Sequence, residues 1–111
     1  MGFGFGNKGH KEVSAQQLDA MIGEGRVQIV DVREPEEFDA GHIPGAINIP
    51  LSAFRASQLP EAQGKLLVLS CAGGKRSAMA LDQCAAVQAM VDTHLAGAFG
   101  AWQAAHLPIE R

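Results

Sequence analysis

The sequence predicts an α/β fold with a mainly parallel central sheet and helices on both faces. Two segments of strand length, residues 27–32 and 65–70, are nearly continuous apolar runs. Such runs are typical of strands covered on both faces, because a half-exposed strand alternates apolar and polar residues. Segments with helical character alternate with the strands along the chain, and this alternation favours a parallel sheet.

The first helix is predicted to begin at Ser14, because Ser14 and Gln17 have the spacing of a capping box. Apolar residues follow at helical spacing, and Gly23 ends the segment. A second helix is predicted to start at Pro35, since the N–H group that proline lacks has no helical partner at that position. Gly41 ends this helix.

The middle and the end of the chain supply the remaining elements. Prolines and a glycine favour a turn and a very short strand over residues 46–49, with a short helix over 52–58. Residues 77–89 form an alanine-rich helical segment whose polar residues do not keep to one stripe, so we expect it to be substantially buried. A short strand over 91–95 and a final helix over 99–105 complete the domain.

Length, charge and cysteine content restrict the class of protein. A chain of 111 residues with 47% hydrophobic residues is long enough for one domain with its own core. The formal net charge of −3 gives no sign of a nucleic-acid-binding face. No apolar run approaches the roughly 18–20 residues of a membrane helix. Two cysteines make a poor disulfide framework, so we expect reduced thiols and a cytoplasmic protein.

Composition also changes along the chain. We expect the glycine-rich residues 1–12 to form a flexible tail without the features of a signal peptide. Residues 13–111 are expected to form a single domain, since no linker divides them.

The junction after the strand at residues 65–70 is the candidate site. Ligands bind at the carboxyl ends of strands in open α/β sheets, and Cys71 stands at such an end. Gly73 and Gly74 can expose backbone N–H groups to an anion, and the following helix adds positive potential at its N-terminus. Lys75 and Arg76 lie at the same N-terminal end of the helix, where their positive charges are unfavourable unless a bound anion compensates them. This field favours thiolate, the nucleophilic form, at Cys71.

Two other interpretations of this junction stay open on local chemistry alone. Cys71 could be a small buried residue in an ordinary strand–helix turn whose glycines serve only the geometry. The loop could also bind phosphate without covalent chemistry, although it lacks the Gly-Lys-Ser/Thr triplet of a P-loop.

Three blocks in order resemble the rhodanese domain family, and the resemblance covers nearly the whole chain. Residues 29–50 are similar to the family's D-x-R…E-[FY]…G-H-I-x-G-A signature. Residues 71–77 match its C-x4-R-S active-site loop, and residues 95–102 with Leu107 and Pro108 resemble its closing L-x-G-G-x-x-x-W…G-x-P segment. Ala98 and His106 stand where the family commonly has glycine, which puts local turn geometry in question.

The resemblance implies a sulfurtransferase of the thiosulfate type, and we expect no cofactor. His10, His94 and His106 show no metal-ligand spacing with the cysteines, so we also expect no metal. Cys71 would take the outer sulfur of a small anionic donor such as thiosulfate and become a persulfide, and a thiophilic acceptor, cyanide or a thiol, would remove it. The loop would hold the substrate sulfur through Ala72, Gly73, Gly74, Lys75, Arg76 and Ser77. Lys75 and Arg76 would attract the donor and offset charge on the leaving sulfite.

Two alternatives to this activity differ in the use of the loop. Phosphatases related to the family use a loop one residue longer, C-x5-R, so the C-x4-R spacing here favours a sulfur-sized site. A sulfur-relay or binding module loaded by a partner protein would also use Cys71, but it would turn over small donors poorly.

Other conspicuous residues receive structural interpretations. We expect Asp31 and Arg33 to fix the strand–helix turn by charge-assisted hydrogen bonds. His42 is expected to make a structural hydrogen bond beside Gly41. Cys84 is interpreted as a core thiol beyond disulfide reach of Cys71, and Trp102 as a packing anchor.

Overall fold

The computed structural model describes residues 10–111, which form a five-stranded sheet in the order β1-β5-β4-β2-β3. Every strand pairing in it is parallel. The strands are β1 (Lys11–Val13), β2 (Val27–Asp31), β3 (Ile47–Asn48), β4 (Leu66–Ser70) and β5 (Thr93–Leu95). The helices are α1 (Ala15–Gly23), α2 (Pro35–Ala40), α3 (Lys75–Ala86) and α4 (Ala98–Ala104), with two 3-10 turns, η1 (Leu51–Ala53) and η2 (Ala56–Gln58). The predicted α/β class is confirmed.

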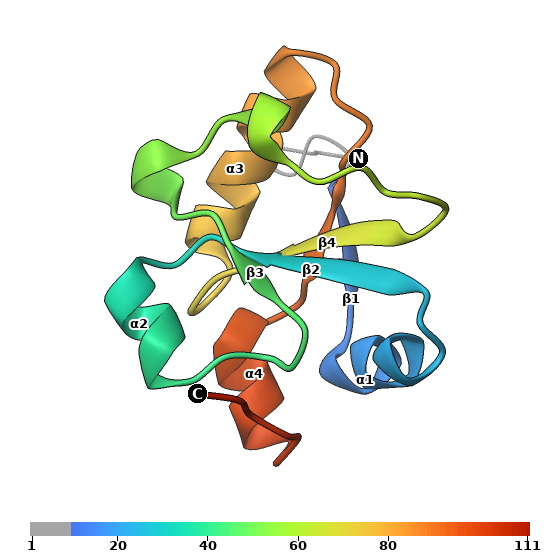
Figure 1. Ribbon diagram of the computed structural model, residues 1–111, viewed down its shortest axis with the longest axis vertical. Helices are drawn as coiled ribbons and strands as arrows, with labels where there is room; N and C mark the ends of the chain where they lie inside the picture. The colour runs from blue at the N-terminus through green and yellow to red at the C-terminus, as the bar shows by residue number, and fades with distance from the viewer. Residues whose placement is uncertain (1–9) are drawn as a thin grey trace, which may run out of the picture.

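Helices cover both faces of the sheet (Figure 1). The face under α3, η1 and η2 holds one core cluster, which includes Val30, Leu69 and Leu81. The face under α1 and α4 holds a second cluster, which includes Leu18 and Trp102. Neighbouring positions of β2 and β4 point to opposite faces, so both strands place apolar residues on each face, as the sequence predicted.

Three predicted elements need correction. Residues 11 and 12 were assigned to the tail, but they form β1, which pairs with β5 from Lys11 opposite Thr93 to Val13 opposite Leu95. Its side chains are partly exposed because it is an edge strand, so the sequence lacks the apolar run that marks a central strand. The rest of the expected tail, residues 1–9, lies outside the described residues. The helix expected over residues 52–58 is two separate 3-10 turns.

The long helix was also misjudged. It begins at Lys75 and ends at Ala86, whereas the sequence suggested residues 77–89. It is amphipathic, because its buried residues recur at helical spacing and its other face is exposed. The buried stripe consists of Ser77, Ala80, Leu81 and Cys84. Small alanine side chains on the outer face, which carry little hydrophobicity, had obscured this stripe.

Local end signals were read correctly elsewhere. Ser14 and Gln17 form both hydrogen bonds of the capping box at the start of α1. Pro35 is in the first turn of α2. No helix among residues 10–111 is both long enough and apolar enough to cross a membrane.

His106 adopts a left-handed backbone conformation with φ 58°. The left-handed conformation costs a residue with a Cβ roughly 1–2 kcal/mol of folding free energy through steric repulsion, whereas glycine has no such cost. We expect His106→Gly to raise the free energy of unfolding by up to about 1 kcal/mol, since glycine's greater freedom in the unfolded chain offsets part of the gain. Thermal and urea denaturation measure the change. His106→Ala, which keeps the Cβ, is the control, and an equal gain from both variants would contradict backbone strain.

Candidate active site

The loop between β4 and α3 places the Cys71 thiol at the carboxyl end of a central strand. The Cys71 residue is 1% exposed, so the sulfur is recessed beneath the loop. The N–H group of Gly74 donates a hydrogen bond to Sγ over 2.9 Å. Gly74 has φ 112°, a conformation that residues with a Cβ rarely adopt. A glycine is therefore needed here to aim its N–H at the sulfur.

Helix α4 holds the other side of the loop. The N–H of Phe99 donates to the carbonyl of Cys71 over 2.9 Å, and the N–H of Gly100 donates to the carbonyl of Ala72 over 3.1 Å. A Cβ at Gly100 would lie 3.4 Å from the Ala72 oxygen, so the helix and the loop approach closely. Because these two carbonyl oxygens face α4, the loop presents an N–H group and no carbonyl partner to Sγ.

The early start of α3 brings the predicted cations into its first turn. Lys75 and Arg76 belong to the helix, and the first helical hydrogen bond runs from Ala78 N–H to the Gly74 carbonyl. N–H groups ahead of that point have no partner inside the helix and create positive potential. The loop thus borders the positive end of α3.

The structure separates the seven predicted site residues by exposure. Cys71 and Ser77 are buried, and Gly74 and Arg76 are half-buried. Ala72, Gly73 and Lys75 are exposed. All seven are contiguous in the loop and the first turn of α3, but Ser77 takes part through its hydroxyl, which accepts a hydrogen bond from the Cys71 thiol over 3.5 Å.

Arg76 is bound to a partner that the sequence analysis did not identify. Its guanidinium donates two hydrogen bonds to Glu37 of α2, over 2.7 and 3.0 Å. This fork lowers the pKa of Glu37 from its usual value of 4.5 to about 2, mainly through the Arg76 hydrogen bonds, with help from the Glu34 N–H. Glu37 correspondingly raises the pKa of Arg76. The pair fixes α2 against the start of α3.

A cavity of about 350 Å³ lies beside the loop. Ala72, Gly100 and Phe99 form part of its wall, and Arg33, Glu37 and Arg111 are its charged lining residues. Cys71 is not among the lining residues, so the cavity adjoins the loop and stops short of the sulfur. It reaches the loop at Ala72, the residue after Cys71.

The structural interpretation of Asp31 and Arg33 is confirmed. The two side chains are almost fully buried and share a bidentate hydrogen-bonded ion pair, with Arg33 Nη2 at 2.8 Å from Asp31 Oδ2. Arg33 also donates to the Gly41 carbonyl over 2.7 Å, and its guanidinium lies 4.3 Å from the centre of the Phe99 ring. These contacts hold the turn after β2 against α2 and α4.

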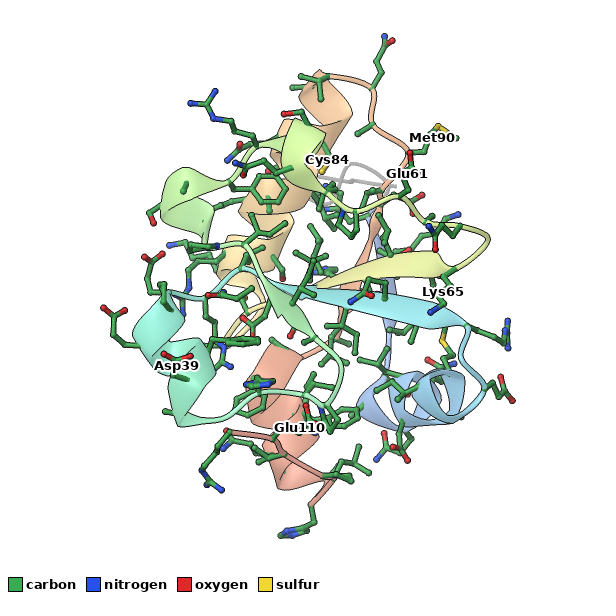
Figure 2. The ribbon with its side chains drawn as sticks, viewed as in Figure 1. Asp39, Glu61, Lys65, Cys84, Met90 and Glu110 are labelled. Carbon is green, nitrogen blue, oxygen red and sulfur yellow. The ribbon has the colours of Figure 1, made fainter. Side chains whose placement is uncertain are left out.

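Three further interpretations agree with the structure. His42 Nδ1 lies 2.8 Å from the Phe38 carbonyl, and the two rings stack. Trp102 is fully buried and donates from Nε1 to the Pro108 carbonyl over 2.7 Å. Cys84 is a free, buried thiol in the C-terminal half of α3 (Figure 2), and burial raises its pKa.

His94 and Glu12 are linked to Cys71 through Ser77, and no local pattern in the sequence indicates this link. His94 Nδ1 lies 2.8 Å from Ser77 Oγ, and Nε2 lies 3.5 Å from Glu12 Oε2. The register of parallel strands puts Glu12 opposite His94 and His94 opposite Leu69, which shares a face with Cys71. Only the strand pairing reveals this neighbourhood, because the residues are far apart in sequence. The described residues contain no group of three or more His, Cys, Asp or Glu side chains arranged for a metal ion.

The sequence model of the family described as rhodanese-like domain matches residues 14–105 of this chain. The chain belongs to this family. Membership supports sulfur transfer as the general chemistry of this rhodanese-like domain, because its relatives include sulfurtransferases.

Two sequence relatives and one structure illustrate the similarity. An uncharacterised protein from Synechocystis is 41% identical over 86% of this chain, which spans 54% of that protein. The human thiosulfate:glutathione sulfurtransferase is 33% identical over 85% of this chain and 94% of its own length. A rhodanese-related protein from Thermoplasma volcanium superimposes with a TM-score of 0.78 at 27% identity, over 91% of this chain and 98% of its own.

The lowered pKa of Glu37 makes the link between α2 and α3 sensitive to acid. A carboxyl whose pKa is lower in the folded state stabilises the fold above its unfolded pKa and loses that contribution as the pH falls. We expect the Arg76 pair to stabilise fully above about pH 4.5 and to fail as the pH approaches 2. The loss is limited to about 1 kcal/mol, because both partners are partly exposed to solvent.

Glu37→Gln keeps an oxygen for the Glu34 N–H and removes the charge that binds Arg76. The melting temperature of Glu37→Gln should therefore be below that of wild type at pH 7, and the two should converge as the pH is lowered to 2.5. Glu36→Gln, which removes an exposed neighbouring charge, is the matched control. A Glu37 variant that behaves like the Glu36 variant at every pH would refute this link.

Proposed function

We propose that this domain is a thiosulfate sulfurtransferase in which Cys71 carries the sulfur as a persulfide. The Cys71 thiolate attacks the outer sulfur of thiosulfate, forming a sulfur–sulfur bond. The bond between the two thiosulfate sulfurs breaks, and its electron pair leaves with sulfite. An acceptor, cyanide or a thiol, then attacks the outer persulfide sulfur, and the Cys71 thiolate is regenerated. This is double displacement with a covalent intermediate.

The hydrogen bond from the Gly74 N–H to Sγ is the observation that carries this proposal. A buried sulfur that faces a backbone donor at the positive end of a helix is stabilised as an anion, because both dipoles oppose its charge. The same donors stabilise charge that develops on sulfur in each transition state, where preorganised dipoles contribute strongly to catalysis. A cysteine that only packs in the core does not require a glycine in a left-handed conformation whose N–H points at its sulfur.

The surroundings of the loop suit an anionic donor. Lys75 is exposed at the first turn of α3, and Arg76 keeps N–H groups beyond the two that bind Glu37. These cations attract thiosulfate and offset charge on sulfite. The cavity beside Ala72 offers the acceptor a route, and a thiol acceptor is in keeping with the name of the human relative. Two free cysteines suit a reducing compartment, so we also place the activity in the cytoplasm.

The first test is the intact mass of the protein after brief treatment with thiosulfate. We expect wild type to gain one sulfur atom and to lose it, with release of thiocyanate, when cyanide is added. Cys71→Ser should gain nothing, while Cys84→Ala should load like wild type, because Cys84 lies away from the Gly74 donor. Equal loading of wild type and Cys71→Ser would overturn the assignment of the nucleophile.

The same measurement separates the sulfur-relay alternative. A relay module would gain little from thiosulfate and would gain the sulfur atom from a persulfide donor such as glutathione persulfide. Loading by the persulfide alone would replace the enzyme proposal by the relay proposal, with Cys71 as carrier in both.

A second prediction concerns the charge of Arg76. We expect Arg76→Ala to lower kcat/KM for thiosulfate by about tenfold or more, equivalent to about 1.4 kcal/mol of transition-state stabilisation. Glu37→Gln also removes the ion pair but leaves the arginine charge at the loop, so it should retain most of the activity. Steady-state kinetics and melting temperatures of both variants provide the check. Equal losses in the two variants would assign Arg76 a purely structural role.

A further inference from the structure

The Ser77 hydroxyl lies between the Cys71 thiol and the His94 imidazole. It is 3.5 Å from Cys71 Sγ and 2.8 Å from His94 Nδ1. All three residues are buried, with His94 7% exposed and Ser77 fully enclosed. The chain of contacts joins three elements, the end of β4, the first turn of α3 and β5.

The position of Glu12 selects the tautomer of His94. Glu12 Oε2 lies 3.5 Å from Nε2, where its negative charge attracts a proton on that nitrogen, so we assign the ring proton to Nε2. Nδ1 then has a lone pair and accepts from the Ser77 hydroxyl. The hydroxyl oxygen in turn accepts from the Cys71 S–H. The Gly74 carbonyl, 3.1 Å from Ser77 Oγ, is a second acceptor for the single hydroxyl proton, so it competes with Nδ1.

We propose that His94 is a positioning residue that takes up the Cys71 proton through the Ser77 hydroxyl. The proton on Sγ moves to Ser77 Oγ while the hydroxyl proton moves to His94 Nδ1. The products are a Cys71 thiolate and a His94 imidazolium, so charge and protons balance. The thiolate then receives two hydrogen bonds, from the Gly74 N–H and from the Ser77 hydroxyl. When the acceptor regenerates the thiolate, the proton returns by the same path.

This relay rests on the proposed role of Cys71 as nucleophile, and it answers a difficulty that burial creates. A thiol that is 1% exposed has little contact with water to take its proton. The path through Ser77 and His94 ends at Glu12, whose side chain is 61% exposed. The proton of a buried sulfur can therefore reach the surface at the sheet edge.

The pKa of His94 lies below its usual value, and burial is the main cause. Burial lowers the pKa of His94, the Glu12 carboxylate raises it, and His10 lowers it. The His10 ring meets His94 edge-on with 6.1 Å between ring centres, and His10 Nε2 lies 3.1 Å from Asp82 of α3. The lowered pKa favours the neutral ring, which has a free lone pair for the proton, and Glu12 stabilises the charge that the ring gains.

The test is the rate of Cys71 alkylation by iodoacetamide against pH, followed by mass on the peptide that contains Cys71. His94→Asn keeps an amide that can bond the Ser77 hydroxyl but cannot take up a proton. We expect its half-maximal rate about one pH unit above that of wild type, the scale of one nearby opposite charge. Below both midpoints, alkylation should be about tenfold slower, because one pH unit is a tenfold change in thiolate fraction.

Two further variants distinguish the loss of the proton acceptor from a general structural effect of the substitution. His106→Asn makes the same substitution at an exposed position and should leave the midpoint unchanged. Glu12→Gln alters only an exposed side chain and should move the midpoint upward by a smaller amount, since His94 loses its counter-charge. A His94→Asn midpoint equal to that of wild type overturns the relay and leaves His94 a structural residue.

A measurement on the wild-type ring remains decisive if His94→Asn does not fold. The titration of His94, followed by NMR, should move to lower pH in Cys71→Ser, because the ring loses the neighbouring thiolate. An unchanged titration overturns the relay. Neither readout needs sulfur transfer, so a shifted midpoint without persulfide formation would reject the proposed function and keep the relay.

Discussion

The buried ion pair between Asp31 and Arg33 is the contact on which the arrangement around the loop depends. Arg33 reaches from the end of β2 to the carbonyl that closes α2 and to the face of Phe99 in α4. The backbone of Phe99 in turn binds the Cys71 carbonyl. Removing one partner of a buried pair costs roughly 3–5 kcal/mol, because the other charge stays behind without compensation. Cys71 is therefore held in place partly by contacts that begin at the end of β2, the strand next to the one that precedes Cys71.

Two kinds of contact meet at Cys71 and act in different directions. Hydrogen bonds from backbone N–H groups of α4 to the carbonyls of Cys71 and Ala72 fix the backbone of the loop. The N–H of Gly74 and the hydroxyl of Ser77 reach the sulfur itself, which sets its chemical environment. The first set explains why the final helix belongs to the site although it carries no reacting group. The second set makes Gly74 and Ser77 the residues whose polar groups contact the sulfur.

The sequence was sufficient for those parts of the fold that local patterns determine. Continuous apolar strands, the capping box at Ser14 and the proline at the start of α2 act over a few residues, and each was read correctly. The strand–loop–helix junction at Cys71 was also predicted from local sequence, since strand, glycines and cations are adjacent, and the structure has this junction. Edge strand β1 was missed because its partly exposed residues follow no apolar pattern.

The contacts that could not be predicted join residues distant along the chain. Arg76 meets Glu37 across 39 positions, and Ser77 meets His94 across 17. Neither pair has a local signature, because its formation depends on which strands are neighbours and on where α3 begins. Moving that start by two residues turned Lys75 and Arg76 from loop residues into helical ones, with fixed directions for their side chains.

Strand β1 also bears on where this domain can be cut. The match to the family begins at residue 14, one position after β1 ends. A chain trimmed to that boundary would uncover the whole outer edge of β5, where Thr93–Leu95 would offer unpaired backbone groups to any extended segment. Bare edges of this kind invite sheet-to-sheet association between molecules. Trimming to the family boundary would thus replace the short, charged edge of β1 by the buried residues of β5 and favour association between molecules.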